Sequence, residues 1–211
     1  ERTATLRHLL QSRSGVYRPA AFATPSEQAT MPAPGSHQPG ASYWYNNWGF
    51  NALGTIVRNA TGQTIGALLE ERIATPLGMQ DFSPANVRDY RVEQSRHGAY
   101  LTQMSTRDRA RFGYMYLRNG CWAGQQIVPA NWVAESLAPS TNRDRADDFG
   151  YTWRSSEGVT AVGMTDHVNA LVGPNTFVVD LMCDARNEAA LAELEHVDPG
   201  RVLDVGRGGE P

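Results

Sequence analysis

The segment that most constrains this chain is YWYNNWGFNALG, residues 43–54, in which aromatic residues and two adjacent amides lead directly into a helical pattern. Buried Tyr and Trp side chains usually need hydrogen-bonding partners for their O–H and N–H groups. Asn47 stands where the N-cap of the helix is expected, because its side-chain oxygen could accept a backbone N–H there. The segment allows two interpretations. It is either a packed aromatic loop with a good cap, or a phenol (Tyr45) and an amide (Asn47) held at the start of a helix for proton transfer and substrate binding.

Composition narrows the possible functions. The chain has 211 residues, of which 41% are hydrophobic, so it can bury the core of one domain or of a large part of a two-lobed one. Its net charge of −3 gives no reason to expect nucleic acid as a partner. An apolar run of about 18 residues, which a membrane span would need, is absent from the sequence. Neither a compartment nor an oligomeric state is indicated.

Lysine is absent from this sequence, since all 19 basic residues are arginine. A lysine amine of this chain therefore cannot act as a base, form a Schiff base or bind a phosphate. Metal-dependent hydrolysis is also disfavoured, because the five histidines show no HxxxH or HxH pairing. We expect no cofactor and no metal.

Residues 1–140 predict a mostly helical lobe. Helical spacing and capping residues predict helices over 3–13, 48–60, 65–74 and 105–118, and another after Pro129. Gly62 is the expected stop of the second helix, and Ser105 to Asp108 resemble a capping box. The prolines of residues 15–42 predict a long irregular loop, and residues 80–100 carry no clear signal.

The pattern changes after Pro139. Short β-rich runs at 149–154, 159–163, 168–173 and 176–182 predict a meander of antiparallel strands. Residues 187–197 predict a helix that covers one face of this sheet. The region 141–197 thus reads as sheet strands plus a C-terminal helix, and residues 198–211 as a flexible tail.

Several segments, in order and at fitting separations, resemble one enzyme family. They are TLRHLLQSRSGVY (5–17), YNNWGF (45–50) with its Tyr-x-Asn pattern, ALGTIVRNATGQTIGALLEERIATPLGM (52–79), MSTRDRARFGYMYLRNGCWAGQQIVPANWV (104–133) and FGYTW (149–153). The chain is similar to the serine β-lactamase and penicillin-binding-protein-like hydrolases, in particular to their class C-like branch of esterases and peptidases. The resemblance extends over residues 5–154.

The resemblance implies a fold and a chemistry. The fold would be a single partial α+β domain of the β-lactamase type. The reaction would be acyl transfer on a small-molecule ester, amide or β-lactam. Tyr45 would be the acid/base partner that shares a proton relay with the lysine of a Ser-x-x-Lys segment, and Asn47 would hydrogen-bond the substrate.

The sequence also departs from the family pattern. Ser-x-x-Lys is missing; in the family it precedes the segment that resembles residues 5–17. We therefore expect the nucleophile and the N-terminal strands of the sheet to lie outside this chain, which by itself should be inactive. A non-catalytic relative, serving as a binding or structural module, is the alternative.

Two further sequence features concern the site. The family's Lys/His-x-Gly motif has only a loose counterpart in VGMTDHVNALVGPN, residues 162–175, because Asn169 stands where the glycine would follow His167. His167 is a candidate substrate-binding residue, or part of a polar turn. Ser36 precedes His37, but adjacent side chains usually diverge and the sequence has no Gly-x-Ser-x-Gly elbow, so Ser36 is not expected to be a nucleophile.

Overall fold

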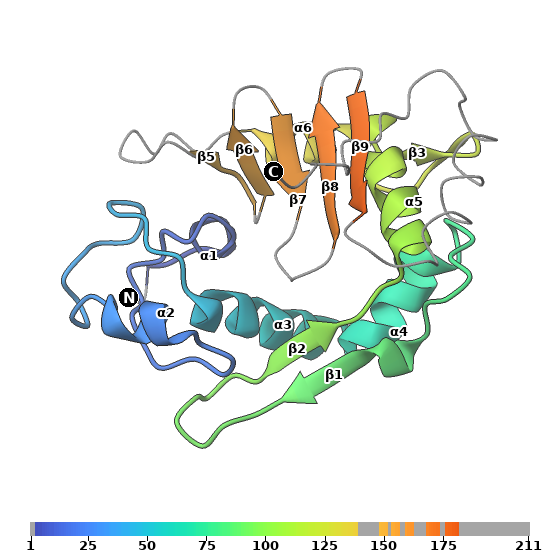
Figure 1. Ribbon diagram of the computed structural model, residues 1–211. Coiled ribbons are helices and arrows are strands. Elements are labelled where there is room, and N and C mark those ends of the chain that lie inside the picture. Colours follow the sequence, from blue (N-terminus) through green and yellow to red (C-terminus); the bar gives the residue numbers. More distant parts are fainter. Residues whose placement is uncertain are drawn as a thin grey trace, which may run out of the picture. The chain divides into compact units, whose positions relative to one another are not determined.

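The structure, a computed structural model, describes residues 3–138, 148–151, 153–156, 159–162, 168–173 and 176–181. It confirms the predicted α+β class, with helices in the first part of the chain and an antiparallel sheet in the second (Figure 1). The chain forms two compact units. One joins Glu1–Leu69 to Ser83–Gln103, and the other joins Glu70–Phe82 to the residues from Met104 onward. Within the described part, no helix has the length and apolar character needed to cross a membrane.

The first unit contains the aromatic segment with Tyr45 and the helix that follows it. Its elements are α1 (Leu6–Leu10), α2 (Pro25–Ala29), α3 (Asn47–Thr61), α4 (Ile65–Leu69), a 3₁₀ turn (Pro84–Asn86), β1 (Val87–Tyr90) and β2 (Ala99–Thr102). The predicted stop of α3 is confirmed. Gly62 adopts the left-handed conformation at φ 71°, and its N–H donates to the Arg58 carbonyl oxygen at 2.8 Å.

Helix α2 corrects the prediction of an irregular loop over residues 15–42. Thr24 is its N-cap and accepts the Glu27 N–H at 3.1 Å, while Pro25 occupies the first turn. Proline is favoured there, because its fixed φ suits a helix and the missing N–H has no helical acceptor. Thr24-Pro25-Ser26-Glu27 also has the S/T-x-x-E spacing of a capping box, the signal that would have predicted this helix.

A hairpin forms where residues 80–100 carried no clear signal. Strands β1 and β2 pair antiparallel, with Val87 opposite Thr102 and Tyr90 opposite Ala99. Helix α3 packs on β2 through a close approach at Gly54, where an added Cβ would lie 2.3 Å from the Tyr100 ring. The absence of a side chain at Gly54 thus lets the helix lie against the hairpin.

The second unit contains the sheet. Its elements are a π-helical turn (Glu70–Ala74), α5 (Thr106–Leu117), β3 (Cys121–Trp122), β4 (Gln125–Gln126), α6 (Ala130–Leu137), β5 (Asp148–Phe149), β6 (Trp153–Ser156), β7 (Val159–Val162), β8 (Val168–Gly173) and β9 (Thr176–Leu181). Strands β5 to β9 form one five-stranded antiparallel sheet in sequence order, as the predicted meander requires. Helix α5 packs against β8 and β9 (Figure 1). The predicted helix at 187–197, the tail at 198–211 and the boundaries near residues 140 and 197 lie outside the described residues.

The core of this unit is apolar, with one buried carboxylate beside it. Leu77, Ala110, Met115, Tyr116 and Val133 form the buried cluster. Asp108, which is fully buried, accepts the Gln80 N–H at 3.0 Å and the Asp81 N–H at 3.1 Å. Only one of the two hydrogen bonds of the capping box predicted at the start of α5 is therefore present. The Ser105 hydroxyl accepts the Asp108 N–H at 3.3 Å, but the Asp108 carboxylate binds the N–H groups of residues 80 and 81 and not that of Ser105.

The ion pair between Asp81 and Arg107 makes stability depend on pH. Arg107 donates to both carboxylate oxygens, from Nε at 2.8 Å and from Nη2 at 2.5 Å, and these bonds lower the pKa of Asp81 to about 2. A carboxyl whose folded pKa lies below its unfolded value of 3.8 stabilises the native state above that value. This contribution is lost as the pH falls toward 2, and it is modest because the pair is partly exposed.

We therefore expect Asp81→Asn to lower the free energy of unfolding at pH 5 and to have little effect at pH 2. Urea unfolding of both proteins at the two pH values measures the difference. An equal loss at both pH values would contradict the assignment to the ionised carboxylate.

Candidate active site

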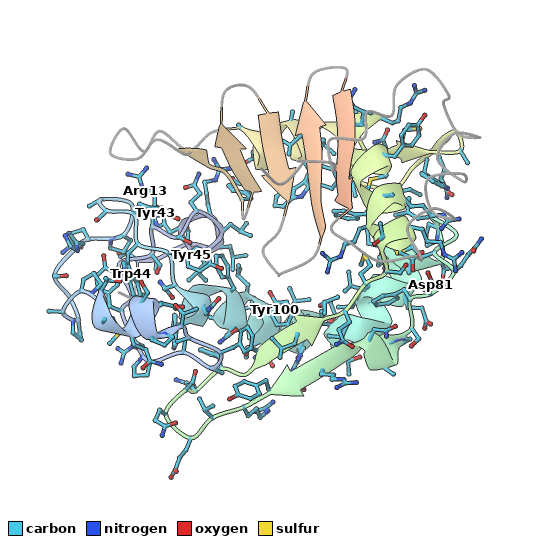
Figure 2. The ribbon with its side chains drawn as sticks, viewed as in Figure 1. Arg13, Tyr43, Trp44, Tyr45, Asp81 and Tyr100 are labelled. Atoms are coloured by element: carbon cyan, nitrogen blue, oxygen red, sulfur yellow. The ribbon has the colours of Figure 1, made fainter. Side chains whose placement is uncertain are left out.

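Tyr45 lies at the end of the extended segment that enters α3 (Figure 2). Its side chain is half-buried, and its ring packs against that of Phe50 with centroids 5.3 Å apart. The segment is tied to the loop that follows α1, because the Trp44 N–H donates to the Ser12 carbonyl oxygen at 2.9 Å. The backbone on both sides of the phenol is thus anchored, by this bond before it and by the helix after it.

The N-cap of α3 is Asn46, which corrects the expectation for Asn47. Asn46 has extended backbone angles, is 3% exposed, and its Oδ1 accepts the Gly49 N–H at 2.8 Å. Asn47 is the first helical residue. The middle residue of the Tyr-x-Asn pattern, Asn46, therefore caps the helix, and the Asn47 side chain is available for other contacts.

Asn47 is held instead by a carboxylate from another helix. Its backbone N–H donates to Glu27 Oε1 at 2.6 Å, and its side-chain Nδ2 donates to Glu27 Oε2 at 2.9 Å. Nδ2 also donates to the Phe22 carbonyl oxygen at 2.9 Å. Both hydrogens of the side-chain amide are therefore engaged.

Glu27 is a buried carboxylate, 7% exposed, at the N-terminus of α3. Burial raises its pKa, and the hydrogen bonds from Asn47 and from the Thr24 backbone oppose that rise. The first turn of a helix favours an anion, because its N–H groups point at the ligand and the helix dipole is positive there. The sequence interpretation missed Glu27, because residues 15–42 were read as an irregular loop.

A second bond, one turn further along α3, holds the same loop. The Asn51 side chain, 4% exposed, donates to the Ala21 carbonyl oxygen at 3.0 Å. Between these anchors Phe22 adopts a left-handed backbone with φ 64°, which for a side chain of this size costs roughly 1–2 kcal/mol. The bonds from Asn47 and Asn51 stabilise this strained loop on the helix.

The side chains of Ser36 and His37 contact each other, although adjacent side chains were expected to diverge. Ser36 Oγ lies 3.1 Å from His37 Nδ1, and the Tyr17 hydroxyl lies 3.0 Å from the same nitrogen. This nitrogen offers either one lone pair or one N–H, according to the tautomer, so the two hydroxyls compete for a single hydrogen-bonding position. The contact packs the loop against Tyr17, and this competition makes Ser36 a poor candidate for an activated nucleophile.

His167, the third predicted site residue, lies outside the described residues, between β7 and β8. Within the described residues, no group of three or more His, Cys, Asp and Glu side chains could hold a metal ion. The candidate site residues that the structure does describe are therefore Tyr45 and Asn47, and Glu27 accepts two hydrogen bonds from Asn47.

Comparisons with known proteins agree on one family. The sequence matches the Beta-lactamase family over residues 1–173. No protein with a curated description matches it. Among solved structures, the chain is similar to a protein described as a 6-aminohexanoate-dimer hydrolase from Bacillus anthracis, with 18% identity, a TM-score of 0.58, and coverage of 93% of this chain and 62% of that one.

Two further solved structures are similar. A D-stereospecific amidohydrolase from Streptomyces sp. has 19% identity and a TM-score of 0.57, with coverage of 82% of this chain and 65% of that one. A penicillin-binding protein from Bacillus halodurans has 20% identity and a TM-score of 0.56, with coverage of 92% and 72%. These likenesses show the fold. The chain spans less than two thirds of the length of the first two structures, at 62% and 65%.

Proposed function

The chain belongs to the Beta-lactamase family, and on this basis we propose that it forms part of a serine hydrolase that transfers acyl groups from a small-molecule ester, amide or β-lactam. The observation that supports this most is the Tyr-x-Asn segment at the start of α3. The N-cap bond that Asn46 makes to the Gly49 N–H and the carboxylate of Glu27 hold Asn47 there, and Tyr45 precedes the cap. The names of the similar structures, an amidohydrolase and a penicillin-binding protein, favour amide-like acyl donors.

The proposed reaction needs a nucleophile that residues 1–211 do not contain, because the sequence has no lysine for a Ser-x-x-Lys segment. The serine hydroxyl of that segment attacks the substrate carbonyl carbon. Its proton passes to the lysine and Tyr45 and from there to the leaving group. Water then attacks the carbonyl carbon of the acyl-serine, and the same groups take its proton and return it to the serine oxygen as the acyl–oxygen bond breaks and the acid is released.

The other two site residues contact the substrate in this proposal. Asn47 hydrogen-bonds the acyl part of the substrate, beside the reacting carbonyl. His167, next to strand β8 in sequence, binds the substrate in this proposal, in place of the family's Lys/His-x-Gly motif. No step requires a metal or a cofactor.

Covalent labelling of the full-length protein that carries residues 1–211 tests this proposal. We expect a fluorescent penicillin to acylate one serine, or a fluorophosphonate to phosphonylate it with loss of fluoride, and mass spectrometry to locate that serine in a Ser-x-x-Lys sequence outside residues 1–211. An adduct on a residue within 1–211 would contradict the mechanism. Absence of both an adduct and turnover would favour the alternative function, a non-catalytic binding or structural relative, to which the missing lysine also points.

A further inference from the structure

Helix α3 presents a stripe of side chains to the hairpin of β1 and β2 (Figure 1). Trp48, Asn51, Thr55 and Arg58 follow one another at intervals of three or four residues, so they lie on one face of the helix. At the C-terminal end of this stripe, Arg58 donates to both carboxylate oxygens of Asp89 in β1. One end of the hairpin is therefore tied to α3 by an ion pair.

The turn that joins the two strands docks on the same stripe through His97. Its Nδ1 lies 3.1 Å from the Thr55 hydroxyl oxygen, and its ring packs against that of Trp48 with centroids 5.0 Å apart and planes at 71°. The Ser95 hydroxyl donates to the His97 carbonyl oxygen at 2.8 Å, which fixes the turn at this residue. The imidazole is half-buried and contacts the helix through both a polar atom and its ring.

The bonds of Thr55 decide which nitrogen of His97 carries the proton. A hydroxyl has one hydrogen, and that of Thr55 is donated to the Asn51 carbonyl oxygen at 3.2 Å. Thr55 therefore accepts a hydrogen bond from His97, whose neutral ring carries its proton on Nδ1. A second proton has to enter at Nε2, and it places a positive charge in the contact with α3.

The surroundings of His97 disfavour that charge. Burial lowers the pKa of His97 below its ordinary value of 6.5, and the neighbouring Arg96 lowers this pKa further. The other charged residues of the turn, Arg91 and Glu93, are exposed. On α3, Arg58 carries the next positive charge along the stripe, and its partner in β1 balances it.

We propose that the hairpin is a pH-sensitive strap, which docks on α3 through neutral His97 and is released when His97 takes up its second proton. A histidine with a lowered pKa in the docked state stabilises that state fully above pH 6.5, and the contribution is lost as the pH falls through the lower docked pKa. The proposal concerns the fold and does not rest on the proposed hydrolase.

The strap also contacts the strained loop at Phe22. The Phe22 ring packs edge-on against that of Tyr90, at the end of β1, with centroids 6.0 Å apart. Asn51, whose carbonyl oxygen accepts the Thr55 hydroxyl, holds the same loop through its side-chain bond to the Ala21 carbonyl oxygen. Release of the hairpin therefore removes one of the contacts that hold a loop with a left-handed backbone at Phe22.

Hydrogen exchange of the full-length protein, measured by mass spectrometry, tests the release. A two-stranded hairpin is at best marginally stable by itself, so its cross-strand amides lose protection once it leaves α3. After correction for the intrinsic pH dependence of exchange, we expect the protection of residues 87–102 to fall roughly threefold from pH 7.5 to pH 5.0. Equal or greater protection at pH 5.0 would overturn the proposal.

His97→Asn assigns the pH dependence to one residue. Asparagine can donate from Nδ2 where His97 donates from Nδ1, but it takes up no proton in this pH range. We expect the hairpin of this variant to be protected equally at both pH values, and a fall as large as the parent's would overturn the proposal. His8→Asn is the matched control, because it removes a histidine of α1 in the same unit. It should keep the parent's fall, and loss of that fall would remove the assignment to His97.

Nuclear magnetic resonance of the parent protein with ¹⁵N-labelled histidine supplies a readout that needs no variant. We expect neutral His97 to carry its proton on Nδ1, and its pKa to be lower than in the urea-unfolded protein. A higher pKa would mean that Trp48 stabilises the imidazolium through a cation–π contact. A neutral ring protonated on Nε2 would contradict the bond to Thr55. Either result would overturn the proposal.

Discussion

Tyr45→Phe is expected to lower kcat/KM of the full-length protein by roughly 10²- to 10⁴-fold, the range typical of a side chain that transfers a proton in the transition state. The substitution removes only the hydroxyl. The ring remains to pack against Phe50, where the centroids are 5.3 Å apart, so most of the stability should be kept. The rate of 4-nitrophenyl ester hydrolysis and the melting temperature of both proteins test this prediction.

Tyr43→Phe provides the control for that experiment. Tyr43 loses the same atom from the same segment, two residues before Tyr45 (Figure 2). We expect the Tyr43 variant to keep activity within a few fold of the parent, because this residue has no place in the proposed proton relay. If Tyr45→Phe kept more than about a third of the activity, another group would have to move the proton.

The largest expected effect on stability is that of Asp108→Ala. This carboxylate is fully buried, binds the N–H groups of Gln80 and Asp81, and lies 3.5 Å from Arg111 Nη1. Its removal leaves two backbone donors and a mostly buried guanidinium without that partner. We expect a loss of about 3–5 kcal/mol in the free energy of unfolding, measured by urea denaturation.

Asp89→Ala is the matched control for this change, because the same substitution there removes a half-exposed partner of Arg58. We expect a loss of no more than about 1 kcal/mol, as for most exposed ion pairs. Asp108→Asn should fall between the two, since it retains one acceptor oxygen. Equal losses in Asp108→Ala and Asp89→Ala would show that burial of the carboxylate does not matter.

The secondary structure was predicted well where local chemistry decides it. Gly62 ends α3 because a glycine adopts the left-handed backbone without a steric penalty, and Ser105 begins α5 through a bond within its own turn. The strands of the meander follow from alternating β-rich runs and turn residues. Helix α2 was missed because the prolines of its surroundings outweighed a capping signal only four residues long.

The candidate site was predicted in part. Tyr45 and Asn47 were singled out by their place in an aromatic segment before a helix, and their chemical roles stay predictions. Which of the two asparagines caps α3 could not be decided from the sequence, because both have the right side chain. The backbone at Asn46 is extended and that at Asn47 is helical, and only the three-dimensional structure distinguishes them.

The sequence by itself determined the family and helix α3 after Tyr45, because glycines and hydrophobic spacing act over a few neighbouring residues. It also determined that residues 1–211 contain no lysine, so a Ser-x-x-Lys nucleophile cannot come from them. Only the tertiary structure decided how the Asn47 side chain is held. Its orientation depends on a carboxylate 20 residues away in the chain, brought to the N-terminus of α3 by the fold of an intervening loop, and no local pattern encodes a contact of that kind.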